Sequence, residues 1–163
     1  MKITFLDAST VDAGDINLDC IREHGDLIIH STTSNNETLQ RVIDSEIIIT
    51  NKVVIDKPII EASKKLKLIV VSATGYNNID VEAAKTNNVT VCNVVDYSTP
   101  IVAQHTISLI LNLCGQTYKY LNEKSLWPSS PIFTRLDHRV TEISGKTLGI
   151  VGVGNIGSKV GEI

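Results

Sequence analysis

The chain has 163 residues, of which 42% are hydrophobic and 20% charged, as in a globular protein with room for one domain and part of a second. Its net charge of -3 and its lack of any basic run argue against a nucleic-acid-binding surface. No apolar run reaches the ~18 residues of a membrane span. The apolar patch at the N-terminus is too short for a signal peptide, so we expect a cytoplasmic protein that binds neither nucleic acid nor membrane.

Short β-branched apolar runs alternate with amphipathic segments up to residue 93. The runs predict strands at 2–6, 26–30, 46–50, 66–71 and 88–92, and the segments between them predict helices at 14–24, 36–44, 57–64 and 80–87. Strands that are apolar almost throughout are typical of a parallel sheet buried on both faces. We therefore predict an open, doubly wound α/β domain with right-handed crossovers.

Local signals mark the starts of several of these helices. Asn36 precedes residues at helical spacing, and the carboxylate of Asp80 can accept bonds from the first free amides of a helix. Pro58 suits the first turn of a helix that begins near Asp56. These residues predict three N-termini.

The pattern changes after residue 93. Residues 96–121 predict one long helix, capped by Ser98 or Thr99 and apolar nearly all round, which is typical of a helix buried between layers or at a subunit contact. Residues 122–146 predict a long connection, of a length that usually has a function. Residues 147–153 predict a sixth buried strand. We place a domain boundary near residue 97, so that the domains are 1–97 and 98–163.

The three cysteines and four histidines give little sign of chemistry. Cys20, Cys92 and Cys114 are odd in number and far apart, which indicates reduced thiols and no metal site. His105 lies on the long apolar helix, where a lone histidine is more often a core residue than a catalytic one. No histidine is paired in sequence with a nucleophile.

A glycine motif follows the sixth predicted strand. Gly152, Gly154 and Gly157 have the spacing G-x-G-x-x-G, between an apolar run and a helical start. Such glycines permit a tight turn, close approach of a pyrophosphate and close helix packing, while the amides of Asn155 and Ile156 would face the phosphates. The alternative is a tight turn without ligand. The acidic residue that holds the ribose, about 20 positions further on, has no counterpart in the chain.

A second candidate loop, 72–80, follows the fourth predicted strand. The amides of Ala73, Thr74 and Gly75 could form a nest for an anion, and Gly75 can take a positive φ. The alternative is an ordinary connection. Lys52, after the third strand, would face the same crevice and could meet an anionic substrate, although a lysine at this place is more often an ordinary surface residue.

Asp7 follows the first predicted strand, as a carboxylate of receiver domains does. In receiver domains a phosphoacceptor acid follows the third strand, and here that place holds Thr50 and Asn51. The receiver interpretation is therefore disfavoured.

The sequence "NNIDVEAAKTNNVTVCNVVDYSTPIVAQHTISLIL", with "GKTLGIVGVGNIG" further along, resembles the D-isomer-specific 2-hydroxyacid dehydrogenases. The forms "ATGYNNID", "YST" and "VAQHT" look closest to the glycerate dehydrogenase (hydroxypyruvate reductase) branch, with D-3-phosphoglycerate dehydrogenases as neighbours. The resemblance covers the chain from about residue 40 to its end, and weakly the first strand.

The resemblance implies a flavodoxin-like substrate domain followed by the truncated start of a Rossmann domain that binds NAD. It implies substrate contacts by Asn51, Lys52, Ala73, Thr74 and Gly75, and cofactor contacts by Thr106, Gly152, Gly154, Asn155, Ile156 and Gly157. It also implies a two-fold homodimer built by the long helix and the arm that follows it, residues 122–146. Such a contact would explain Trp127 in a polar segment.

The family's catalytic arginine, glutamate and histidine all follow the glycine loop, and none has a counterpart here. We expect the N-terminal half of an NAD-dependent oxidoreductase that acts on a small D-2-hydroxy or 2-keto acid, inactive and weak in NAD binding by itself. The alternatives are a self-sufficient module that binds small anions and a dimerising module without catalysis.

Overall fold

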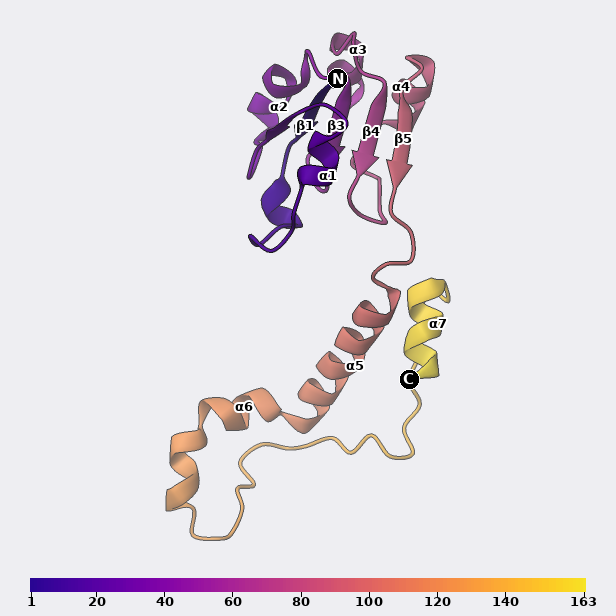
Figure 1. Ribbon diagram of the computed structural model, residues 1–163. Coiled ribbons are helices and arrows are strands. Elements are labelled where there is room, and N and C mark those ends of the chain that lie inside the picture. The colour runs from indigo at the N-terminus through magenta and orange to yellow at the C-terminus, as the bar shows by residue number, and fades with distance from the viewer. The chain divides into compact units, whose positions relative to one another are not determined.

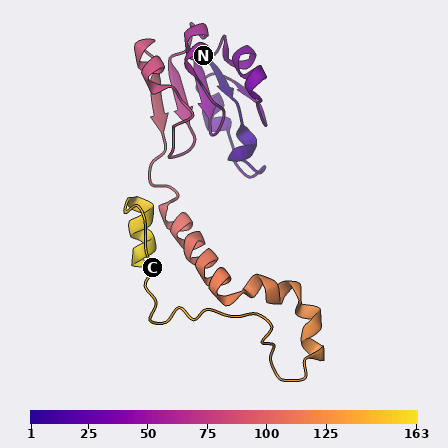
Figure 2. The same cartoon turned by 180° about the vertical axis from the view of Figure 1, so that it is seen from behind.

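A computed structural model describes residues 1–163, which divide into two compact units, Met1–Val95 and Asp96–Ile163 (Figures 1 and 2). The assignment of the two parts as substrate and nucleotide domains stays a prediction.

The first unit contains a five-stranded parallel sheet in the order β2-β1-β3-β4-β5, which is the flavodoxin-like order. The strands are β1 (Lys2–Phe5), β2 (Asp26–Ile29), β3 (Ile47–Thr50), β4 (Leu68–Val71) and β5 (Thr90–Asn93). All five predicted strands form, with ends that differ by one or two residues from the prediction. The predicted α/β fold class is confirmed for this unit.

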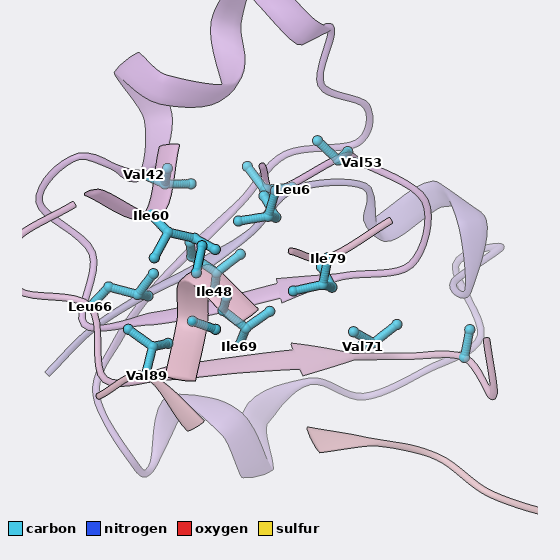
Figure 3. Close-up of a cluster of buried hydrophobic side chains, with 14 residues drawn as sticks. Leu6, Val42, Ile48, Val53, Ile60, Leu66, Ile69, Val71, Ile79 and Val89 are labelled. Carbon is cyan, nitrogen blue, oxygen red and sulfur yellow. The ribbon is translucent and has the colours of Figure 1, made fainter. Parts of the chain in front are cut away.

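Successive side chains of each strand point to opposite faces of the sheet and so fill two cores. Ile48, Ile69 and Val71 belong to the larger core, which α2 (Asn35–Val42), α3 (Lys57–Ala62) and α4 (Val81–Thr86) cover (Figure 3). Phe5 and Ile49 belong to the smaller core on the other face, against which α1 (Asp19–Arg22) packs. Helices therefore lie on both faces, as a doubly wound sheet requires.

The helix starts follow the local chemistry, with two differences. Asp56 and Asp80 cap α3 and α4, because their carboxylates accept the N–H groups of Ile59 and Ala83 at 3.2 and 2.8 Å. The prediction of Asn36 as a cap is wrong: α2 begins after Ser34, whose N–H donates to the side chain of Glu37 in a capping box.

The predicted helix 14–24 is wrong over its first five residues, because only Asp19–Arg22 is helical. One carboxylate oxygen of Asp12 accepts the N–H groups of Gly14, Asp15 and Ile16 at 2.7, 3.1 and 3.2 Å. Gly14 has a φ of 92°. This local turn, which follows the short helix η1 (Ala8–Thr10), competes with helix formation for the same amides.

The second unit is helical. It contains α5 (Thr99–Gly115), α6 (Thr117–Asn122), η2 (Lys124–Ser129) and α7 (Asn155–Glu162). The prediction of one helix over 96–121 is wrong at Gln116, whose φ of 54° is left-handed and ends α5. Helices α5 and α7 pack side by side (Figures 1 and 2), with Ala103 and Val160 buried.

The predicted sixth strand at 147–153 does not form, so this prediction is wrong for the chain described here. These residues have no ladder partner, and the second unit contains no strand with which they could pair. A parallel strand gains its hydrogen bonds only from neighbours. Leu148, Val151 and Val153 are consequently exposed.

Helix α5 is apolar on most sides, yet only Ala103 is buried within the single chain. Ile101, Leu109, Leu111 and Leu113 are all exposed. Burial between layers, one of the two predicted situations for this helix, is therefore not found in the single chain.

Candidate functional site

The candidate substrate site lies at the carboxyl edge of the sheet, where the loops after β1, β3 and β4 meet. Asp7 follows β1, and its carboxylate accepts the N–H of Asn51 at 2.9 and 3.1 Å and the N–H of Lys52 at 2.6 Å. Asp7 is only 4% exposed. The segment after β3 is therefore fastened to the end of the neighbouring strand.

The loops after β3 and β4 are joined to each other. Ile55 and Ile79 form a parallel bridge, and the N–H of Ile55 donates to the carbonyl of Asn78 at 2.9 Å. The side-chain amide of Asn78 donates to the carbonyl of Val53 at 3.0 Å. The two predicted substrate segments, 51–52 and 73–75, thus belong to one hydrogen-bonded framework.

The loop after β4 presents amides that have no partner within the protein. The N–H groups of Ala73, Thr74 and Gly75 donate to no protein atom. The loop is held instead through its carbonyls: Asn93 donates to the carbonyl of Thr74 at 2.8 Å, and Val94 donates to that of Ala73 at 3.0 Å. Thr74 and Gly75 are exposed, so their N–H groups are available to an anion from solution.

Gly75 does not use the positive φ that the sequence would permit. A Cβ at this position would meet only the side-chain oxygen of Asn77, at an ordinary 3.5 Å. The glycine keeps the loop surface open without a left-handed conformation.

The side chains around these loops supply further polar groups. Lys52 is exposed and forms no ion pair. The side-chain oxygens of Asn51 and Ser72 are buried and have no hydrogen-bond partner. At the carboxyl end of β2, burial lowers the pKa of His30, and the charge of Arg41 adds to that effect. The carboxyl edge of the sheet thus carries the cation of Lys52 and polar groups that have no partner within the protein.

The candidate cofactor loop lies in the second unit, with Gly152 at a φ of 93°. A Cβ on Gly157 would lie 2.0 Å from the carbonyl oxygen of Gly152, so only glycine fits there. A Cβ on Gly154 would meet nothing within 4 Å. Gly154 is the N-cap of α7, and the N–H groups of Asn155 and Ile156 have no partner within the protein.

This loop borders a hollow of about 440 Å³ between α5 and α7. Its lining comprises Thr106, Ile110, Leu148, Gly149, Ile150, Val151, Gly152, Ile156, Gly157 and Val160. Thr106, Gly152, Ile156 and Gly157 are therefore brought together. The side chain of Asn155 is engaged elsewhere, because it donates to Asp96 at 2.6 Å. The hydroxyl of Thr106 donates to the carbonyl of Val102 at 2.8 Å.

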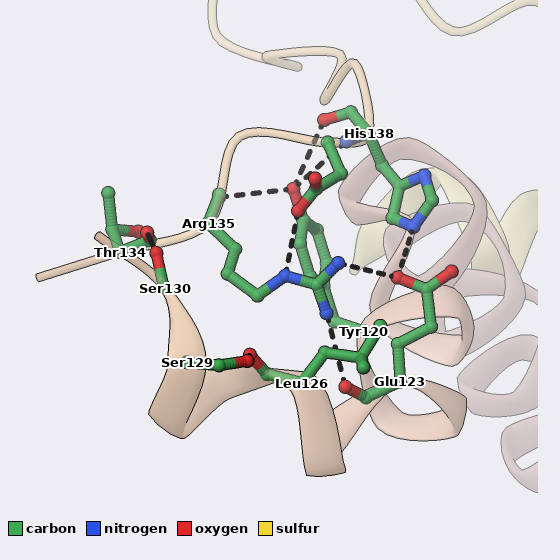
Figure 4. Close-up of polar contacts among 9 residues, drawn as sticks. Tyr120, Glu123, Leu126, Ser129, Ser130, Thr134, Arg135 and His138 are labelled. Atoms are coloured by element: carbon green, nitrogen blue, oxygen red, sulfur yellow. Dashed lines mark hydrogen bonds and ion pairs between the residues drawn. The ribbon is translucent and has the colours of Figure 1, made fainter. Parts of the chain in front are cut away.

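The structure also shows a polar network in the arm that the sequence interpretation missed (Figure 4). The carboxylate of Glu123 pairs with Arg135 at 2.9 Å and with His138 at 3.0 Å, and the pKa of Glu123 is lowered, mainly by its hydrogen bond from His138. The Arg135 side chain is only 8% exposed. The partners are 12 and 15 residues apart, so no local spacing indicates them.

Several other predictions can be compared with the structure. His105 is exposed on α5, so its interpretation as a core residue is wrong; α5 packs against α7 through another face. The three cysteines are unpaired. No group of three or more His, Cys, Asp or Glu side chains could hold a metal ion, and none of the helices has the length and apolarity to cross a bilayer.

The flavodoxin-like strand order defines an α/β protein of the doubly wound class. Residues 6–156 match the family described as "D-isomer specific 2-hydroxyacid dehydrogenase, catalytic domain". The chain belongs to this family of oxidoreductases, as the resemblance implied.

Individual relatives agree with this assignment. A hydroxypyruvate reductase of Blautia hydrogenotrophica is 32% identical over 168 residues, with 100% of this chain and 52% of that protein covered. A glycerate dehydrogenase of Methylorubrum extorquens is 32% identical, with 98% and 51% covered. An acyclic imino acid reductase, solved in complex with NADPH and D-Arg, is 29% identical with a TM-score of 0.77, and 99% of this chain and 52% of that one are covered. The chain thus spans about half the length of these relatives.

Proposed function

We propose that this chain forms the substrate-binding part and the first cofactor-binding segment of an NAD-dependent dehydrogenase. The reaction is a reversible hydride transfer between nicotinamide and a small D-2-hydroxy acid, with glycerate and hydroxypyruvate as the pair. The names of two relatives support this choice of substrate. We assign the chain to the N-terminal half of the enzyme.

The observation that carries the proposal is the set of free amides at Ala73, Thr74 and Gly75. A carboxylate binds well to consecutive N–H groups, because each donates a charge-assisted hydrogen bond. Asn93 and Val94 hold the loop carbonyls on its other side, so the donors need little rearrangement on binding. Lys52 adds a positive charge at the same edge, next to Asn51.

The residues of the glycine loop fit the diphosphate of NAD. The backbone at Gly154 is open, and the unpartnered N–H groups of Asn155 and Ile156 lie at the N-terminus of α7, where the helix dipole favours an anion. Gly152 and Gly157 allow the turn and the helix to approach each other, and Thr106 borders the same hollow. When bound, NAD supplies the nicotinamide that accepts or donates the hydride.

No histidine of this chain takes the part of the acid–base catalyst. We therefore expect no hydride transfer by the chain alone, since a positioned acid–base group contributes about 10²–10⁴-fold. We also expect a dissociation constant for NAD no tighter than about 1 mM, because the ribose-binding acid is absent from these residues.

We further propose that the enzyme is a homodimer built through α5 and the arm. Ile101, Leu109, Leu111 and Leu113 are exposed on α5, and Phe133 is 96% exposed in the arm. An apolar surface of this kind is typical of a subunit contact. Sedimentation at micromolar concentration should give twice the mass of 17.8 kDa; a monomer would contradict the dimer.

Amide-resolved NMR tests the substrate site. Hydroxypyruvate and D-glycerate should shift the amide signals of Ala73, Thr74 and Gly75 in a saturable way, whereas glycerol, which lacks a carboxylate, should not. Replacing Asn93 by alanine should weaken the response, because Thr74 then loses its anchor. Unmoved signals at 73–75 would refute the substrate site.

The same spectra separate the alternative functions. NAD should shift the amides of Gly154, Asn155 and Ile156 at millimolar concentration. If keto acids move the signals of 73–75 but NAD moves nothing at 152–157, a module that binds small anions describes the chain better than a dehydrogenase part does. If neither ligand has an effect and the chain dimerises, the dimerising module is favoured.

A further inference from the structure

Asp7 is a buried carboxylate whose only partners are backbone amides. It is 4% exposed, and its two oxygens accept the N–H groups of Asn51 and Lys52. No lysine, arginine or histidine lies within ion-pair distance of it. Burial of a charge is unfavourable unless strong hydrogen bonds compensate for it, so the arrangement calls for an explanation.

The position of Asp7 supplies one. The strand order β2-β1-β3-β4-β5 changes direction between β1 and β3, and the ligand crevice of an open α/β sheet lies at such a switch point. Asp7 follows β1, and Asn51 and Lys52 follow β3, so all three residues lie at this point. Two consecutive N–H groups that point at one carboxylate form the kind of cradle that binds a free anion.

We propose that Asp7 is a built-in carboxylate that fills the amide cradle at the switch point. It positions the Lys52 segment, and it leaves the free amides of 73–75, after β4, as the place where the carboxylate of the substrate binds. Asp7 is a positioning residue, since it acts through the backbone of Asn51 and Lys52. The second half of this inference rests on the proposed function; the first half does not.

The inference predicts what happens when the carboxylate is removed. In Asp7→Ala the amides of Asn51 and Lys52 lose their acceptor, and the side chain leaves a space of about the size of formate. Formate should enter this space and restore the hydrogen bonds. In the unsubstituted chain the cradle is full, and formate should leave the amides of residues 51 and 52 unaffected.

Hydrogen exchange and amide chemical shifts show directly whether the N–H groups of Asn51 and Lys52 have an acceptor. In Asp7→Ala the amide of Lys52 should exchange at least about tenfold faster, as expected when hydrogen bonds to a charged acceptor are lost. Saturating formate should restore the slow exchange and the original shifts. Asp12→Ala is the matched control: Asp12 also accepts three backbone N–H groups, but it is only partly buried, and its removal leaves no enclosed space for formate.

A merely structural role for Asp7 predicts a different result. The amide of Lys52 would then exchange fast in Asp7→Ala, and formate would not restore slow exchange, although the amides of β3 stay protected. This result would overturn the inference. If Asp7→Ala does not fold even in formate, Asp7→Asn decides. Its remaining oxygen should hold only part of the cradle, so Lys52 should exchange faster than in the original chain; equal exchange would overturn the inference.

The directing role is tested separately with hydroxypyruvate. In the original chain hydroxypyruvate should leave the hydrogen exchange of Asn51 and Lys52 unchanged, because Asp7 remains the acceptor of their N–H groups. In Asp7→Ala without formate, hydroxypyruvate should slow that exchange, as formate does. Recovery in formate without any response at 73–75 would retain the cradle and refute the proposed substrate site. If hydroxypyruvate changes the hydrogen exchange of Asn51 and Lys52 in the original chain, the filled cradle is refuted and the substrate site still stands.

Discussion

Replacement of Gly157 by alanine tests whether the close contact between the glycine turn and α7 determines the stability of α7. A Cβ at residue 157 would lie 2.0 Å from the carbonyl oxygen of Gly152 and 3.1 Å from its carbonyl carbon. The obstacle is backbone, which cannot rotate away as a side chain can. The helix or the turn must therefore shift by more than 1 Å, because an ordinary contact begins near 3.4 Å.

Two opposing effects determine how much Gly157→Ala changes the stability of the α7 contact. Alanine is more favourable than glycine within a helix by about 1 kcal/mol. Overpacking by one methyl group costs about 1–3 kcal/mol, and we expect the upper end because the contact is with a backbone oxygen. The net destabilisation of the α7 contact is about 2 kcal/mol, or a roughly 30-fold increase in local opening.

Amide hydrogen exchange at Ser158, whose N–H donates to the carbonyl of Gly154 at 2.9 Å, measures this opening. Gly161→Ala is the matched control, because it lies in the same helix and its Cβ would meet only the side chain of Ile150, at an ordinary 3.5 Å. The control should exchange no faster than the original chain. If Gly157→Ala also exchanges no faster, helix propensity alone governs α7, and the close approach to Gly152 has no energetic consequence.

Three further predictions concern the two units separately. Ile48→Ala should lower the free energy of unfolding by about 2–5 kcal/mol in urea titration, because Ile48 is fully buried in the larger core. Asp80→Ala should cost about 1 kcal/mol in the same assay, because the N–H of Ala83 loses its cap; an unchanged midpoint would count against the cap. The pKa of Glu123 is lowered, mainly by the hydrogen bond from His138, so its contribution to arm stability is complete above the ordinary value of 4.5 and is lost as the pH falls through the lowered pKa. The fluorescence of the single tryptophan should change over this acid range, and Glu123→Gln should remove that transition.

The strands of the first unit could be predicted because their signals are local and repeated. Each run of β-branched apolar residues is long enough for one buried strand, and the alternation with helices leaves few possible topologies. The carboxylate of Asp80 likewise acts on an amide three residues away. The cap at Asp80 could be predicted because the carboxylate and the amide that it accepts lie within one helical turn.

The failures have two physical origins. Gln116 and Asp12 redirect the backbone through local conformations that compete with a helix, and apolar periodicity does not register them. The partners of Asp7 and Glu123 lie far along the chain: Asn51 is 44 residues from Asp7, and His138 is 15 residues from Glu123. The sequence shows that Asp7 is an acidic residue directly after a predicted strand, but only the fold identifies the N–H groups that its carboxylate accepts.

The segment around the glycine loop contains a turn that is determined by local sterics and a predicted strand that depends on neighbouring strands. The conformation of Gly152 and the contact at Gly157 follow from the absence of a Cβ, and both are present although the strand before them is not formed. The strand at 147–153 depends on neighbours that the second unit does not contain, and its apolar side chains remain exposed. Because the turn is determined by local sterics, its unpartnered amides are in place before any sheet surrounds them. The proposed binding of a diphosphate at this loop would therefore use the turn and the N-terminus of α7.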